Sequence, residues 1–169
     1  MLESILSPSE CAECKFCCSF IRNTVWGTPL FDSELLAKLT KLYPSAKFKP
    51  VDEVTATVDL EERYVSNDPE EEAPCWFNEG NGCILGDDKP FECKSWPLRV
   101  MRMKDGRLVI ALSLGCKTVS KKPLDEVKRL AEELSGEMMN YARKCPAYIK
   151  DYREGYPVLK TLWCFSCYN

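Results

Sequence analysis

Eleven cysteines and no histidine define the chemistry that is open to this chain of 169 residues. Without an imidazole, zinc sites of the Cys₂His₂ and His₃ types are excluded, and so are nucleophiles that histidine activates. A metal site in this chain must therefore be built mainly of sulfur. Zinc would need a Cys₄ site, and iron would need an iron–sulfur cluster.

The densest pattern of possible ligands is the run Cys11-x₂-Cys14-x₂-Cys17-Cys18. A two-residue gap lets two sulfurs reach one metal or one face of a cluster, and two such gaps in series resemble the start of a bacterial ferredoxin run. The ferredoxin run continues with x₃-Cys-Pro, whereas Cys18 follows Cys17 directly. Adjacent side chains do not easily point the same way. We therefore expect Cys17 and Cys18 to serve different sites, or one of them not to be a ligand.

A second group of cysteines follows later in the chain, and its members are Cys75, Cys83, Cys93 and Cys116. Gly80 and Gly82 lie between the first two of these cysteines and allow the tight backbone that metal loops need. Prolines bracket Cys93, so that cysteine lies in a rigid turn.

Together these motifs resemble the YkgJ-type cysteine-cluster family, which is described as a zinc- or iron-chelating domain. The resemblance rests on the cysteine run 11–18, Cys75, Gly82-Cys83-Ile84 and Lys89-Pro90-x₂-Cys93-Lys94-x-Trp96-Pro97, and it covers about residues 11–117. The family usually has Arg-Pro and Phe-Pro where this chain has Lys-Pro and Trp-Pro, and often a small residue in place of Lys15. The resemblance implies that the ligands are Cys11, Cys14, Cys17, Cys18, Cys75, Cys83 and Cys93, with Cys116 as the match to a later family cysteine.

Three cysteines lie outside the resemblance. Cys145-Pro146 is similar to the Cys-Pro of ferredoxin motifs, but it also falls where a predicted helix ends, so both interpretations stay open. Cys164-x₂-Cys167 would be either a further pair of ligands or an exposed redox pair. Trp163 and Phe165 predict that this tail docks onto the domain.

The number of motif cysteines fits two Cys₄ zinc sites, one cluster with extra thiols, or two clusters. We favour a [4Fe–4S] cluster, because the tandem first motif and the proline-flanked cysteines are more typical of cluster ligands than of zinc knuckles. Such a protein would act in redox chemistry or cluster handling. The alternatives are a zinc-stabilised interaction module and an iron–sulfur-dependent methyl- or other group transferase, a role suggested by the similar cysteine cluster of the flagellin lysine methylases.

No catalytic residue can be assigned from the sequence. The acids Glu61, Glu62, Asp87 and Asp88 form no constellation that differs from ordinary surface charge, and a glycine-rich strand–loop–helix for a nucleotide cofactor is missing. Whether the protein is an enzyme stays open at this point.

Composition limits the partners and the compartment. The net charge is −3 with both signs spread along the chain, so no basic footprint for nucleic acid or for an anionic membrane is present. The chain opens without a basic, apolar leader, and it has no long apolar run and an odd number of cysteines. We expect a cytoplasmic protein with reduced thiols and a possible redox or protein partner.

The elements that must position these cysteines predict an α+β fold: a small antiparallel hairpin or sheet, packed helices and long metal-binding cysteine loops. We expect one domain over residues 1–169, with the motif region at about 11–117 and a C-terminal helix and docked tail at 123–169.

A first helix is expected between Phe31 and Pro44, with Asp32 or Ser33 as its cap. Its core stripe would be Leu35, Leu36, Leu39 and Leu42. The alternation from Val54 to Leu60 predicts a half-buried strand, and the acidic stretch 66–72 predicts a solvated loop.

Asp105-Gly106 between two apolar runs predicts a hairpin over Leu98–Leu114. The last element is a helix from about Pro123 to Arg143. Its buried stripe would be Leu124, Val127, Leu130, Ala131, Leu134, Met138 and Tyr141.

Overall fold

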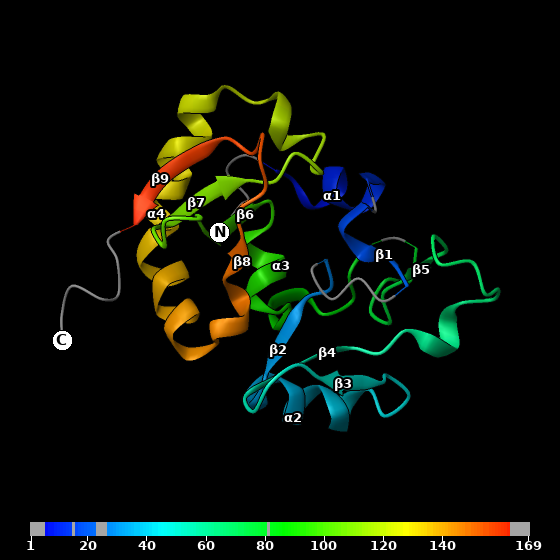
Figure 1. Ribbon diagram of the computed structural model, residues 1–169. Coiled ribbons are helices and arrows are strands. Elements are labelled where there is room, and N and C mark those ends of the chain that lie inside the picture. The colour runs from blue at the N-terminus through cyan, green and yellow to red at the C-terminus, as the bar shows by residue number, and fades with distance from the viewer. Residues whose placement is uncertain (1–5, 15, 23–26, 81, 163–169) are drawn as a thin grey trace. The chain divides into compact units, whose positions relative to one another are not determined.

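The computed structural model describes residues 6–14, 16–22, 27–80 and 82–162 (Figure 1). The chain divides into two compact units. The N-terminal unit is Pro8–Lys94, and the C-terminal unit is Ser95–Asn169 together with Met1–Ser7. Helices and antiparallel strand pairs occur in both units, which confirms the α+β class. Among the described helices, none has the length and apolar character needed to cross a membrane.

The N-terminal unit opens with a short helix and a 3₁₀ turn that carry the cysteine run. Its helices are α1 (Pro8–Cys14), the 3₁₀ helix η1 (Phe16–Cys18), α2 (Ser33–Leu42) and α3 (Phe91–Ser95), whose last residue begins the C-terminal unit. Its strands are β1 (Ser19–Ile21), β2 (Leu30–Asp32), β3 (Phe48–Pro50), β4 (Thr55–Val58) and β5 (Glu72–Pro74). They form an antiparallel pair β1–β5 and an antiparallel sheet of order β2-β4-β3.

The first predicted helix is confirmed as α2, which packs against β2 and β4 (Figure 1). Asp32 is its cap, since one carboxylate oxygen accepts the Leu35 N–H at 3.0 Å. Leu39 is fully buried, and Leu35 and Leu36 pack against the core. The prediction that Leu42 belongs to the core stripe was wrong: Leu42 is the last residue of α2, and its side chain is 58% exposed.

The predicted strand exists as β4, but its half-buried pattern was wrong. Thr55 and Thr57 are buried as fully as Ala56 and Val58, whereas Val54 is exposed. Both faces of β4 are therefore covered, although antiparallel sheets often leave one face open to solvent. The Thr57 hydroxyl compensates for its burial by donating to the Pro29 carbonyl oxygen at 2.8 Å.

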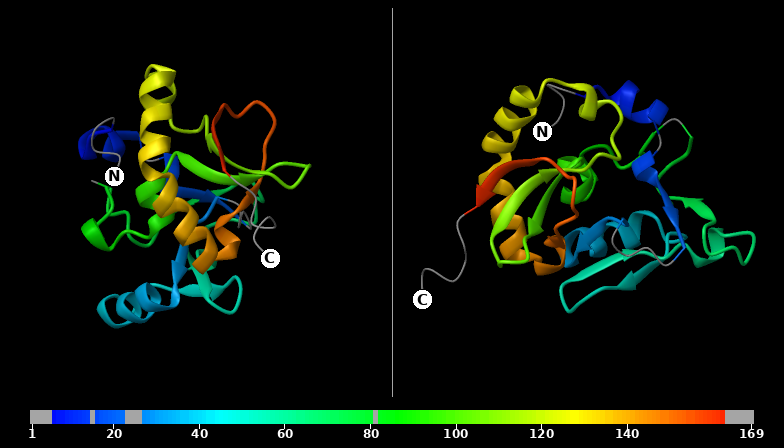
Figure 2. Two further views of the ribbon diagram at one scale, coloured as in Figure 1. Left: turned by 90° about the vertical axis from the view of Figure 1, so that its left-hand side faces the viewer. Right: turned by 45° about the horizontal axis from the view of Figure 1, so that its top comes forward.

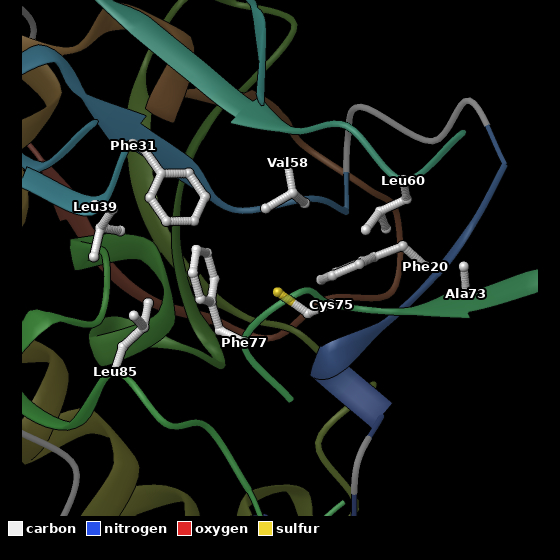
Figure 3. Packing of buried hydrophobic residues seen from close by; sticks show 9 residues of the cluster. All are labelled: Phe20, Phe31, Leu39, Val58, Leu60, Ala73, Cys75, Phe77 and Leu85. Carbon is white, nitrogen blue, oxygen red and sulfur yellow. The ribbon is translucent and has the colours of Figure 1, made fainter. Parts of the chain in front are cut away.

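The core of the N-terminal unit is aromatic and includes a cysteine. The rings of Phe31 and Phe77 lie 6.0 Å apart, and Tyr43 meets Phe77 edge-on at 5.4 Å. Figure 3 shows the Cys75 sulfur between the side chains of Phe77 and Phe20. Cys18 and Cys83 pack against the same core from its margin. The core therefore extends up to three of the predicted ligands.

The C-terminal unit is a four-stranded sheet covered by one long helix. The strands are β6 (Leu98–Arg102), β7 (Leu108–Leu112), β8 (Lys150–Asp151) and β9 (Val158–Leu162), in the order β8-β6-β7-β9, and the helix is α4 (Leu124–Lys144). The hairpin β6–β7 confirms the predicted one, with Gly106 at φ +86° in its turn. Both views in Figure 2 show α4 lying along this sheet, and it contacts β6 and β9.

The predicted last helix is confirmed as α4, with small changes at its ends. Pro123 precedes the first helical residue and occupies the cap position. Most of the predicted stripe is buried, and Ala142 belongs to it as well. Leu124 was wrongly assigned, because it is 44% exposed in the first turn, and Tyr141 is partly buried against the Tyr148 ring.

The acidic stretch 66–72 is a loop up to residue 71, and Glu72 begins β5. The loop has internal order, since the Glu71 carboxylate accepts the Val65 N–H at 2.6 Å and the Ser66 N–H at 2.9 Å. Further short 3₁₀ turns at Glu61–Arg63, Gly86–Asp88, Val119–Lys121 and Pro146–Tyr148 complete the two units.

Candidate functional site

Two segments of the N-terminal unit are joined at Cys18. Cys11 and Cys14 lie in α1, while Cys17 and Cys18 lie in η1, which leads directly into β1. The Cys75 N–H donates to the Cys18 carbonyl oxygen at 2.8 Å, one step beyond the β1–β5 ladder. The first cysteine run is thus fixed against the loop that carries Cys75.

The loop that follows Cys75 brings Cys83 back beside the start of that loop. The Asn78 N–H donates to the Cys75 carbonyl oxygen at 3.1 Å, and Asn78 also forms an isolated β-bridge with Cys83. Cys93 enters from a third segment at the start of α3, where its N–H donates to the Pro90 carbonyl oxygen at 2.9 Å. Three segments that are distant in sequence therefore contribute cysteines to one region of this unit.

Six cysteine side chains interact with one another in this region, and we call them the six-thiol site: Cys11, Cys17, Cys18, Cys75, Cys83 and Cys93. The Cys17 thiol, with its one proton, is the hydrogen-bond donor that faces the sulfurs of both Cys11 and Cys18. Cys75, Cys83 and Cys93 interact electrostatically in every pairing, and Cys18 interacts with all three.

Two thiols of the site are biased toward the thiolate. The hydrogen bond from Cys17 and the positive charge of Lys89 lower the pKa of Cys11 to about 6 from its usual 9.0, against the opposing effect of burial. The same hydrogen-bond donor, again with help from Lys89, lowers the pKa of Cys18. Lys89 therefore supplies the counter-charge on this side of the site.

The other four thiols are held in the neutral form. Donation to Cys11 and Cys18 raises the pKa of Cys17, because loss of its proton would break both hydrogen bonds. Burial raises the pKa of Cys75 to about 12, and burial is also the main cause of the raised pKa values of Cys83 and Cys93. Neighbouring sulfurs add to the effect, since one thiolate disfavours the next.

The remaining predicted ligands lie elsewhere. Cys14 ends α1 with an exposed side chain. Cys116 and Cys145 are buried residues of the C-terminal unit, and Cys145 follows the last turn of α4, where its N–H donates to the Tyr141 carbonyl oxygen. Cys164 and Cys167, together with the predicted docking of the tail, lie outside the described residues.

The acidic residues that showed no catalytic pattern in the sequence form ion pairs at the surface. Glu61 pairs with Arg22, Glu62 pairs with Lys47, and Asp88 pairs with Lys38 at 2.6 Å. These partners lie on separate segments, so the ion pairs tie loops to one another rather than converging on a reaction centre.

Two residues of the site were not recognised as functional in the sequence. Lys89 was noted only as part of a motif, and its charge near Cys11, Cys18 and Cys83 depends on the fold. Glu92 is 4% exposed beside Cys93, and its carboxylate accepts the Leu30 N–H at 3.1 Å. The only available signal was the Lys-Pro pair a few residues before Cys93.

The donors of the six-thiol site are all sulfur, which suits a soft, thiophilic metal. Within residues 6–14, 16–22, 27–80 and 82–162, no group of three or more cysteine, aspartate or glutamate side chains is already posed to hold a metal ion.

Comparison of the chain with known protein families, with characterised proteins and with solved structures found no match.

Proposed function

We propose that the N-terminal unit holds a metal centre through cysteine thiolates of the six-thiol site, and that this centre is a [4Fe–4S] cluster acting in redox chemistry or cluster handling. The observation that carries the proposal is the joining of cysteine-bearing segments, since the Cys75 N–H donates to the Cys18 carbonyl oxygen at 2.8 Å and Cys83 bridges Asn78, three residues after Cys75. Unligated cysteines are usually buried one at a time as small apolar residues.

Sulfur is the natural ligand of this site. The nearby buried carboxylate, Glu92, is engaged by a backbone N–H, and the chain has no imidazole to offer. Thiolates select zinc, copper(I) and iron–sulfur clusters over hard cations. Lys89 adds a positive charge next to a centre that would be anionic once ligated, because four thiolates outweigh the charge of a Zn²⁺ ion or of a [4Fe–4S]²⁺ core.

Zinc is the alternative metal, in a structural or interaction module, and one observation favours it. The site is continuous with the aromatic core, as expected for a metal that contributes to folding. For either metal the thiols must stay reduced, so we place the protein in the cytoplasm. The YkgJ-type resemblance of the motifs supports both metals equally.

Anaerobic purification of the full chain, followed by a visible spectrum and by iron, sulfide and zinc analysis, tests the proposal. A brown protein with about four irons and four sulfides per chain is expected for a [4Fe–4S] cluster. A colourless protein with zinc and no sulfide would replace the cluster with the zinc alternative. A protein that carries neither metal, and takes up neither on reconstitution, would overturn the proposal.

A matched pair of variants locates the metal. Cys83→Ser removes one thiol of the six-thiol site and should reduce the metal content at least several-fold. Ile84→Ser introduces the same side chain at the next, exposed position and leaves every thiol in place. Circular dichroism of both variants separates loss of metal from loss of fold. Equal metal content in the two variants would remove Cys83 from the ligand set.

A further inference from the structure

One buried peptide group connects the sheet β2-β4-β3 with the helix that carries Cys93. It is the group between Pro29 and Leu30 at the start of β2, where the Leu30 side chain is fully buried. Its carbonyl oxygen, on Pro29, accepts the hydroxyl of Thr57 in β4 at 2.8 Å. Its N–H, on Leu30, donates to the carboxylate of Glu92 in α3 at 3.1 Å. Side chains from two other elements therefore satisfy both polar groups of this peptide.

The carboxylate of this pair of contacts is itself buried. Glu92 is 4% exposed, and a glutamate is almost never so fully buried unless partners satisfy it. Leu30 lies 62 residues away in the sequence, so the hydrogen bond is a tertiary contact and not a local cap. A backbone N–H that donates to a carboxylate forms a stronger hydrogen bond than one that donates to a neutral acceptor.

The helix α3 depends on tertiary contacts of this kind, because it is only five residues long. In its first turn, the N–H groups of Cys93 and Lys94 both donate to the Pro90 carbonyl oxygen, at 2.9 and 3.1 Å. Glu92 lies in the same turn, next to Cys93. Its hydrogen bond with Leu30 therefore fixes to β2 the turn that carries the Cys93 sulfur.

We propose that Glu92 is a positioning residue for the metal centre: it fixes the first turn of α3 to β2 through Leu30 and so places the Cys93 thiolate for ligation. This role rests on the proposed function, in which Cys93 is one of the ligands. Glu92 acts as a hydrogen-bond acceptor and not as a ligand. Loss of a residue that orients a metal ligand typically costs about 10–100-fold in metal affinity.

Three variants of the full chain test the proposal, with the rate of metal loss to a chelator under anaerobic conditions as the readout. Glu92→Leu keeps similar bulk but removes the acceptor, so it should lose metal roughly 10–100-fold faster than the wild type. Glu92→Gln removes the charge but keeps an oxygen that can accept the Leu30 N–H, so it should lose metal at about the wild-type rate. Thr57→Val is the control, because it removes the other hydrogen bond of the same peptide and leaves α3 attached.

Amide hydrogen exchange of the metal-free chain gives a readout that needs no metal. Exchange at Cys93 and Lys94 should be faster in Glu92→Leu than in Thr57→Val, because only the first variant releases the turn that protects these two groups. If Glu92→Leu does not fold, Glu92→Asp takes its place. That variant keeps the charge but withdraws the carboxylate by one methylene, so it should lose metal faster than Glu92→Gln.

Metal retention in Glu92→Leu, or in Glu92→Asp where it replaces it, would overturn the positioning role. Equal metal loss in Glu92→Leu and Thr57→Val would also overturn it, because a general loss of stability would then be the cause. Equal loss in Glu92→Gln and Glu92→Leu would show that the charge matters and the hydrogen bond does not. Failure of the proposed function would show separately, as a wild-type chain that holds no metal while exchange in α3 still responds to Glu92→Leu.

Discussion

The one thiol proton of Cys17 is shared between the sulfurs of Cys11 and Cys18. This donation stabilises two thiolates that would otherwise repel each other. Lys89 adds positive charge on the same side. A metal ion could supply more positive charge at this place than a proton and a lysine do.

The sequence predicted part of this residue-scale arrangement. The adjacency of Cys17 and Cys18 predicted that they serve different sites or that one of them is not a ligand, and this stays a prediction; the pKa of Cys17 is raised and that of Cys18 is lowered. The placement of Lys89 could not be predicted, because its effect depends on how the segments 11–18 and 83–93 meet. No local pattern specifies a distance between segments so far apart in the chain.

Alkylation of Cys11 in the metal-free protein tests the electrostatics. Its pKa of about 6 means that the thiolate, which is the nucleophile, dominates at pH 7 and is lost as the pH falls through 6. The rate with iodoacetamide, followed by mass spectrometry, should therefore be half-maximal near pH 6. Lys89→Met should move this midpoint upward, and Lys94→Met should not. A wild-type midpoint near 9 would contradict this account of Cys11.

At the scale of elements, caps and tight turns could be predicted from the sequence, whereas the surroundings of a strand could not. Asp32 and the leucine spacing predicted α2, and Asp105-Gly106 predicted the β6–β7 hairpin, because caps and tight turns depend on a few consecutive residues. The threonines of β4 were misjudged, because alternation cannot reveal that both faces of a strand will be covered. Threonine suits either environment when its hydroxyl finds an acceptor.

Thr57→Val tests the buried hydroxyl of β4. The substitution keeps the shape but leaves the Pro29 carbonyl oxygen without its donor, so the free energy of unfolding should fall by about 1–3 kcal/mol. Thr40→Val is the control, since the Thr40 hydroxyl donates to the Leu36 carbonyl oxygen on an exposed helix face. Urea denaturation should show a change below about 0.5 kcal/mol for the control. Equal effects would mean that burial does not matter at Thr57.

Two glycine-to-alanine substitutions in the C-terminal unit should act in opposite directions. Gly106 has φ +86°, which an L side chain adopts only with strain, so Gly106→Ala should cost about 1–2 kcal/mol. Gly136 lies inside α4, where an added Cβ meets nothing within 4 Å, so Gly136→Ala should stabilise by about 0.5–1 kcal/mol. Thermal unfolding measures both. Destabilisation by Gly136→Ala would contradict the helix described here.

At the scale of the whole molecule, the chain divides into two compact units. The N-terminal unit pairs strands from distant segments, as in β1 with β5, and the C-terminal unit adds the short β8 parallel to β6. Neither pairing is made through a tight turn, so the sequence predicted the α+β class but not these strand pairings. Seven of the eleven cysteines lie in the first unit.

Removal of the metal proposed for the N-terminal unit should affect the two units differently. Amide hydrogen exchange after chelation should accelerate in β1, β4 and β5, because the six-thiol site is continuous with the core of that unit. Exchange in β6 and β7 should change little. Equal acceleration in both units would show that the metal stabilises the whole chain rather than the N-terminal unit.

X-ray absorption at the metal edge of the anaerobically purified chain tests the central claim most directly, because it reports the atoms bound to the metal whatever the metal is. Thiolate ligation predicts a first shell of sulfur alone, at about 2.3 Å. A first shell of nitrogen or oxygen at about 2.0–2.2 Å would place the metal outside the six-thiol site and contradict the proposed function.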